Sequence, residues 1–236
     1  MSIPLVLLPD MMCDSRAFWP QMNELSARWT ITVAPVTRAA RFEAIASELL
    51  AELPARFALF GLNFGATVAM DILRQAPDRI DRLCLMGGSP LPEAPAQAAA
   101  REDAIIAAQA GRLQDALDTI RPSQLLAEGP NRPLTKALLG EMARDLGADV
   151  FVRQVRAMQR ARDQQAILRR AKVSTLIACG ADDRVTPLKR HQFVAELMPN
   201  AQLHVIENAG HMAPLEQPAQ VTTMLESWLQ APLVLR

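Results

Sequence analysis

The chain has 236 residues, a length that suits one globular domain with room for an insertion. Half of the residues are hydrophobic, and 25 basic side chains balance 25 acidic ones. A net charge of zero gives no electrostatic reason to expect nucleic acid or an anionic membrane as a partner, although it leaves a small charged substrate open.

The N-terminal segment and the cysteines favour a cytoplasmic protein. MSIPLVLLPD has neither the basic start nor the long apolar stretch of a secretory signal, and no run reaches the ~18 apolar residues of a membrane span. Cys13, Cys84 and Cys179 form no CxxC pair and no disulfide framework. We expect a monomer or a homodimer.

Strand-like and helix-like segments alternate in the first part of the chain. Apolar runs predict strands at residues 3–8, 29–34, 57–62 and 80–86, and helical spacing predicts helices at 15–27, 42–53 and 64–75. Strands separated by helices of ~10–15 residues indicate βαβ units and a parallel sheet.

The alternation stops between residues 90 and 170, which open with PLPEAPAQAAA and contain helical stretches without a convincing strand. It resumes with strands at 173–179 and 203–206 and helices at 188–198 and 217–229. We predict an α/β fold with about six parallel strands. Residues 1–89 and 171–236 would form its core, and residues 90–170 a helical cap inserted after the fourth strand.

A tight turn joins the third predicted strand to its helix. Gly61 and Gly65 flank Asn63 at the spacing G-x-N-x-G. A strand that turns directly into a helix places its middle residue at positive φ, and the flanking positions must be small because the two backbones approach closely. The turn also directs N–H groups of the helix start at whatever lies beside residue 63.

With CGADDRVTP after the fifth strand and ENAGHMAPLEQP after the sixth, the sequence resembles the α/β-hydrolase superfamily over nearly its whole length. It looks most like small bacterial members whose first strand runs into a Pro-containing oxyanion loop. The resemblance implies a nucleophile at position 63, Asp183 as the acid and His211 as the general base. It also implies an oxyanion hole formed by the N–H groups of Met11 and Phe64.

The nucleophile position departs from the family, which has serine, less often cysteine or aspartate, where this chain has Asn63. An amide is a poor nucleophile because its nitrogen lone pair is delocalised and its N–H protons are too weakly acidic for histidine to remove. Four explanations are open. They are natural divergence, a laboratory substitution, a role for Asn63 in orienting substrate, and simple tolerance of positive φ by asparagine.

The oxyanion loop departs as well, because Asp10 stands where the family commonly has glycine. An inward carboxylate would oppose a developing oxyanion, whereas an outward one would only stabilise the turn. Phe18 and Trp19 follow this loop and are candidates to line the pocket, with packing in the core as the alternative. Cys13 is a second, weaker candidate nucleophile.

The remaining polar residues give weaker signals. We expect His191 to be solvated and His204 to be structural. The arginines of the predicted cap are expected to be solvated, unless one of them holds an anionic substrate group: Arg153, Arg156, Arg160 and Arg162. Asp182, Asp183 and His211 lack the further His or Cys of a metal site. GLNFGA is not G-x-G-x-x-G and no Walker sequence is present, so we expect no cofactor.

These features leave three functions open. The family activity would be hydrolysis of a small ester, thioester, amide or C–C substrate, impaired or altered by Asn63. A non-catalytic relative would bind a small ligand in the same pocket. A lyase, decarboxylase or cofactor-independent oxygenase would use Asp10 and His211 for proton transfer.

Overall fold

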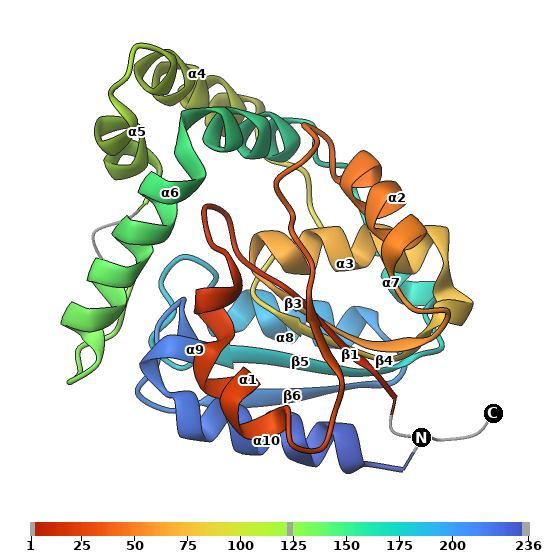
Figure 1. Ribbon diagram of the computed structural model, residues 1–236. Coiled ribbons are helices and arrows are strands. Elements are labelled where there is room, and N and C mark those ends of the chain that lie inside the picture. The colour runs from red at the N-terminus through yellow and green to blue at the C-terminus, as the bar shows by residue number, and fades with distance from the viewer. Residues whose placement is uncertain (1–2, 122–124, 233–236) are drawn as a thin grey trace.

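The computed structural model describes residues 3–121 and 125–232, and within them six strands form one parallel sheet (Figure 1). The strands lie in the order β2-β1-β3-β4-β5-β6. The predicted parallel α/β architecture is confirmed. Their bounds are β1 Leu5–Leu8, β2 Ile31–Val33, β3 Phe57–Leu62, β4 Ile80–Met86, β5 Ser174–Gly180 and β6 Ala201–Ile206.

The central strands are buried on both faces because helices cover each side of the sheet. Successive side chains of a strand point to opposite faces. Leu5 and Leu7 therefore join one apolar cluster, while Val6 and Leu8 join the other. This arrangement explains why β1 and β3 are continuous apolar runs rather than alternating ones.

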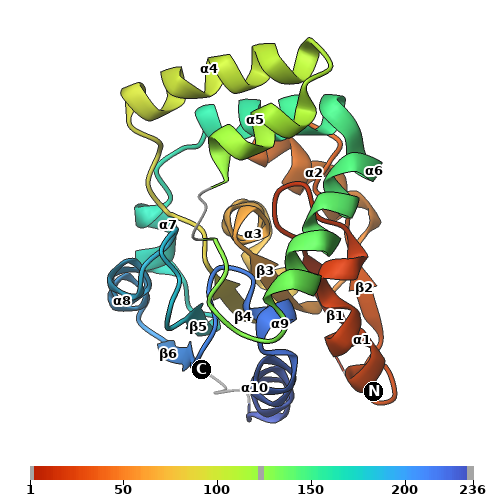
Figure 2. The ribbon, with the colours of Figure 1, turned by 90° about the vertical axis from the view of Figure 1, so that its left-hand side faces the viewer.

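Two groups of helices form the outer layers (Figures 1 and 2). One group packs with Val6 and Leu8 and contains α2 Phe42–Glu52, α3 Phe64–Gln75, α7 Gln165–Arg170 and α8 Leu188–Leu197. The other packs with Leu5 and Leu7 and contains η1 Ser15–Phe18, α1 Trp19–Leu25, α9 Ala213–Glu216 and α10 Pro218–Gln230. A short 3-10 turn, η2 Pro77–Arg79, precedes β4.

Between β4 and β5 the described residues form only helices: α4 Pro95–Gln109, α5 Leu113–Ile120, α6 Arg132–Gln159 and the short α7. We call α4, α5, α6 and the described residues 125–131 the helical insertion. Its helices share an apolar cluster that includes Ile105, Leu117 and Phe151 and also Met12 from the loop after β1. Helix α6 bends at Gly147, whose φ of 78° and ψ of 175° are not helical (Figure 1). The division of the chain at residues 90 and 170 stays a prediction.

The strand order positions the site. β1 has β2 on one side and β3 on the other, so the chain winds in opposite directions from β1. In open parallel sheets, ligands bind outside the carboxyl ends of the strands at such a reversal. Asp10 follows β1 and Asn63 follows β3 at this point. None of the helices in the described ranges is long and apolar enough to span a bilayer.

Candidate active site

The turn between β3 and α3 has the geometry that its glycines predict. Asn63 has φ 48° and ψ −101°, a conformation that side chains rarely adopt. A Cβ on Gly61 would lie 2.6 Å from the Cα of Ala66, and one on Gly65 would lie 2.2 Å from the carbonyl oxygen of Leu8. Both positions exclude a larger residue because the atoms they would meet belong to the backbone.

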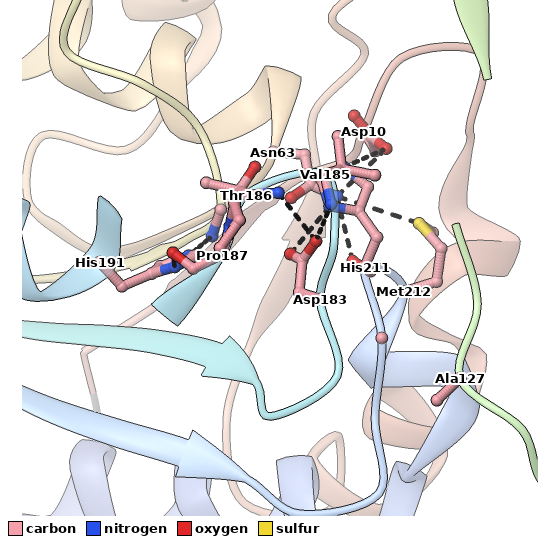
Figure 3. A network of polar contacts seen from close by, with 12 residues as sticks. Asp10, Asn63, Ala127, Asp183, Val185, Thr186, Pro187, His191, His211 and Met212 are labelled. Atoms are coloured by element: carbon pink, nitrogen blue, oxygen red, sulfur yellow. Dashed lines mark hydrogen bonds and ion pairs between the residues drawn. The ribbon is translucent and has the colours of Figure 1, made fainter. Parts of the chain in front are cut away.

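His211 and Asp183 are joined as the sequence motifs imply (Figure 3). Asp183 Oδ2 lies 2.9 Å from His211 Nδ1, and Asp183 Oδ1 accepts hydrogen bonds of 2.8 Å from the N–H groups of Val185 and Thr186. Asp182, the neighbouring carboxylate in the same motif, is exposed. These three contacts hold Asp183 in place, and the one to His211 fixes the tautomer with the proton on Nδ1, so that Nε2 is free to accept a proton.

Asp183 and His211 each stabilise the charged form of the other. Burial raises the pKa of Asp183, but the hydrogen bond and charge of His211, with the two backbone donors, bring it below its usual value. Burial lowers the pKa of His211, yet Asp183 first and then the charges of Asp10 and Glu216 raise it above its usual value. A protonated His211 is therefore stabilised in this site.

Asp10 points inward, which answers the question that its sequence position leaves open. Its Oδ1 accepts hydrogen bonds from the N–H of Met11 at 2.6 Å and of Phe64 at 3.1 Å. These are the two groups to which the resemblance assigns the oxyanion hole. Asp10 Oδ2 lies 3.9 Å from His211 Nε2. The carboxylate thus occupies the place of an oxyanion and faces the histidine.

The Asn63 amide is held beneath Asp10. Its Nδ2 donates to Asp10 Oδ2 at 3.1 Å and to the carbonyl oxygen of His211 at 3.2 Å, and both partners are acceptors, which fixes the amide orientation. Asn63 Oδ1 is buried without a hydrogen-bond partner. It lies against Gly87, where a Cβ would come within 1.7 Å of it. Asn63 therefore orients Asp10 and presents no group that could attack a substrate.

Asp10→Asn is expected to lower the pKa of His211, because the substitution keeps the shape of residue 10 but removes a negative charge 3.9 Å from His211 Nε2. A charge at this distance typically changes a pKa by about 1 pH unit or more. An NMR titration of the histidine rings, assigned with His204→Gln, measures the change. An unaltered midpoint for His211 would contradict the inward placement of Asp10.

A cavity of about 490 Å³ opens beside these residues. Asp10, Asn63 and His211 form its floor, and residues of α4 and α6, such as Gln97 and Met158, form part of its wall. Two predicted lining residues lie elsewhere. Phe18 is buried in the core, where its ring meets that of Phe60 at 5.6 Å, and Trp19 is 54% exposed.

The arginines near the cavity are not those that the sequence suggested. Arg153 and Arg160 donate to backbone carbonyls of the segment before α2, while Arg156 and Arg162 pair with Glu102 and Glu43. The arginines that line the cavity are Arg101, which pairs with Glu93, and Arg190.

The expectation that His191 is solvated is wrong. His191 is only 2% exposed, because its helix face packs against the sheet rather than toward solvent. Its Nε2 accepts a hydrogen bond of 3.1 Å from the N–H of Gly87, and its Nδ1 lies 3.3 Å from the carbonyl oxygen of Pro187. Burial first lowers its pKa, so His191 stays neutral. It supports the Gly87 backbone that packs against Asn63. His204 lies exposed on β6.

His191→Leu is expected to destabilise the protein by about 1–3 kcal/mol, because the buried N–H of Gly87 loses its acceptor. Urea unfolding measures the loss. The matched control is His204→Leu, which changes an exposed histidine and should stay within about 0.5 kcal/mol of the unsubstituted protein. Equal effects of the two substitutions would show that the Gly87 bond contributes nothing.

Two buried side chains near the site escaped sequence reasoning. Gln154 of α6 accepts from the N–H of Met12 at 2.9 Å and donates to the carbonyl of Val36 at 3.1 Å. Glu216 accepts three backbone hydrogen bonds near His211. Burial raises the pKa of Glu216, and these backbone donors offset part of that effect. In the sequence, the indication that Glu216 belongs to the site was its position five residues after His211.

The weaker candidates lack a chemical role in this geometry. Cys13 is buried, and burial first, then the charge of Asp10, raises the pKa of its thiol far above the usual range. A thiol in that state is a poor nucleophile. Within the described ranges, no cluster of three His, Cys, Asp or Glu side chains could hold a metal ion.

Comparison with known sequences gives a family-level match. The model of the alpha/beta hydrolase family matches residues 6–223. A pimeloyl-acyl-carrier-protein methyl ester esterase from Aromatoleum aromaticum is 27% identical over 206 residues, which cover 80% of each chain. A relative from Pseudomonas savastanoi is 33% identical over 85 residues, which span only 32% of that protein's length.

Solved structures support the fold. A thermophilic esterase from Thermogutta terrifontis, with malate bound, has a TM-score of 0.88 at 23% identity, covering 98% of this chain and 90% of the other. The enol-lactonase from Burkholderia xenovorans has a TM-score of 0.84 at 16% identity, covering 98% and 93%. At these identities the likeness concerns the fold alone.

Proposed function

This chain belongs to the alpha/beta hydrolase family, and from that premise we propose that it is a small-molecule enzyme in which His211 transfers a proton and no acyl-enzyme forms. The observation that carries the proposal is the position of Asp10 Oδ1, 2.6 Å from Met11 N and 3.1 Å from Phe64 N. In the family's route these donors would stabilise an oxyanion.

Two features of the site oppose ester hydrolysis by the acyl-enzyme route. Asn63 cannot be activated by His211 as a hydroxyl could. In addition, a substrate oxyanion would form beside the Asp10 carboxylate, and two unit charges 4 Å apart repel by about 4 kcal/mol at the effective dielectric of such a site. That repulsion alone corresponds to roughly a thousandfold loss of rate.

The same arrangement suits His211 as a general base. Neutral His211 holds its proton on Nδ1 through Asp183 and presents Nε2 toward Asp10, 3.9 Å away. When Nε2 takes a proton from a substrate, the new positive charge lies between two carboxylates. Both N–H groups of the expected oxyanion hole already bind Asp10, so a reaction whose negative charge is stable in the leaving group suits the site best. Elimination and lyase reactions meet that condition.

The cavity indicates the class of substrate. A volume of about 490 Å³ is sufficient for a small organic molecule. Its wall is apolar at Phe42, Leu91 and Met158, with the cations of Arg101 and Arg190 beside them. Relatives include a methyl ester esterase. We therefore propose a small, mostly apolar carbonyl compound, neutral or singly anionic, that loses a C–H proton to His211 Nε2 while the adjacent bond to a stable anionic leaving group breaks.

A probe of proton abstraction tests the proposal. 5-Nitrobenzisoxazole opens to a coloured phenolate when a base removes its C–H proton, and the leaving phenolate needs no oxyanion hole. We expect turnover that rises with pH through the raised pKa of His211, since the neutral ring is the base. His211→Gln should abolish it, and Asp10→Asn should move the midpoint to lower pH.

The rival function is binding of a small ligand without catalysis. It predicts that the probe binds, as measured by its competition with other apolar ligands, but opens at the same rate with the unsubstituted protein and with His211→Gln. That result would contradict the proposal that the protein is an enzyme.

A further inference from the structure

Glu216 is a buried carboxylate that holds the backbone on both sides of His211. It is the last residue of α9, is 5% exposed and does not line the cavity that contains Asp10 and Asn63. Its Oε2 accepts a hydrogen bond of 3.0 Å from the N–H of Gly210, and its Oε1 accepts one of 2.8 Å from the N–H of Met212. The two oxygens thus fix the residues before and after the histidine.

The same carboxylate binds the helical insertion. Glu216 Oε2 also accepts from the N–H of Ala127 at 2.7 Å, and the N–H of His211 itself donates to the carbonyl of Leu125 at 2.9 Å. Asn131 Nδ2 donates to the backbone carbonyl of Glu216 at 3.0 Å. Figure 3 places Ala127 next to the chain that carries His211 and Met212.

The backbone before His211 also packs closely against the segment that contains Leu125 and Ala127. A Cβ on Gly210 would lie 2.6 Å from the backbone nitrogen of Ala127 and 2.9 Å from the carbonyl oxygen of Leu125. The residue before His211 must therefore be glycine for the two segments to meet. Gly210 allows the loop before His211 to approach Ala127, and Glu216 holds the two segments together by its hydrogen bonds.

We infer that Glu216 is a positioning residue that couples residues 125–131 of the helical insertion to His211. One carboxylate accepts hydrogen bonds from three backbone N–H groups, and bonds to a charged acceptor are stronger than bonds between neutral groups. If residues 125–131 withdraw, Glu216 loses one of its three donors and His211 loses the acceptor of its own N–H. A ligand that displaces the insertion would then alter the position of His211. Because coupling is reciprocal, a change at His211 would likewise alter the position of the insertion.

The inference rests on the proposed function only in that His211 is taken as the reactive group, and its test needs no turnover. Glu216→Gln keeps the size of the side chain but replaces one acceptor oxygen by an NH2 group. Either Met212, or Gly210 together with Ala127, then faces a group that cannot accept a hydrogen bond. We expect amide hydrogen exchange at all three positions to rise together by at least about tenfold, because the donors form one cooperative unit.

Two further variants make the result decisive. Glu207→Gln makes the same charge change at an exposed residue that precedes the histidine loop, and should leave exchange at the three amides unchanged. Asn131→Ala loosens the insertion without a charge change, and should raise exchange at Gly210 and Met212 as well as at Ala127. It also decides the matter if Glu216→Gln does not fold.

Faster exchange at Gly210 and Met212 with Ala127 unchanged in Glu216→Gln, or at Ala127 alone in Asn131→Ala, would overturn the coupling. A failure of the proposed elimination chemistry would leave these exchange rates unaffected, so the two proposals fail separately.

Discussion

An Asn63→Ser/Asp10→Gly double variant is expected to hydrolyse p-nitrophenyl acetate at least about 100-fold faster than either single variant, both of which should stay near the background rate. Asn63→Ser supplies a hydroxyl that His211 can activate, but Asp10 Oδ1 still occupies the N–H groups of Met11 and Phe64. Loss of a single oxyanion donor commonly costs 100- to 1000-fold in kcat. Only the double variant has both a nucleophile and an empty oxyanion hole.

Covalent labelling gives an independent measurement. A fluorophosphonate that reacts with activated serine should label the double variant in a one-to-one ratio and Asn63→Ser only weakly. Adding His211→Gln to the double variant should abolish both labelling and turnover, which shows that the new serine depends on the histidine. Equal activity of Asn63→Ser and the double variant would mean that Asp10 does not obstruct the hole.

The backbone of the site was predictable because local sequence determines it. Residues 57–62 and 64–75 have in the structure the bounds that the sequence predicts. A continuous apolar strand, two flanking glycines and a following helix rich in apolar residues are typical of this tight strand–turn–helix arrangement. β1, β2 and β6 differ from their predicted bounds by one or two residues at an end, because strand ends depend on hydrogen bonds to neighbouring strands that the local sequence does not record.

The direction of Asp10 was not predictable, because its partners come from different parts of the chain. Met11 is its neighbour, but Phe64 and Asn63 belong to the turn after β3 and His211 to the loop after β6. A side chain in a loop turns toward whichever donors the fold brings to it. Once Asp10 is placed, the departures at residues 10 and 63 become one feature, since the Asn63 amide donates to the carboxylate that replaces an oxyanion.

The buried polar residues were missed for a related reason. The burial of His191 depends on how α8 packs against the sheet, and its helix is otherwise rich in polar residues. The role of Glu216 depends on contact between the end of α9 and a segment almost 90 residues earlier in the sequence, which no local pattern records. The family motif located Asp183 and His211, but it carried no information on what supports them.

The tight approach of α3 to β1 gives the largest expected effect on stability, at Gly65. A Cβ there would lie 2.2 Å from the carbonyl oxygen of Leu8 and 2.7 Å from that of Pro9. These are backbone atoms of a buried strand and of the loop that presents Asp10, so no side-chain rotation can relieve the overlap. Helix and strand would have to separate, which would also move the N–H of Phe64 away from Asp10.

Gly65→Ala is therefore expected to destabilise the protein by about 3 kcal/mol or more, as overpacking against rigid neighbours does. The matched control is Gly140→Ala in α6, where a Cβ would meet no atom within 4 Å. Replacing a helical glycine by alanine should stabilise the protein by about 0.5–1 kcal/mol. Urea unfolding of both variants measures the contrast. Equal stabilities of Gly65→Ala and the unsubstituted protein would contradict the close packing of β1 on α3, and with it the position of the oxyanion loop.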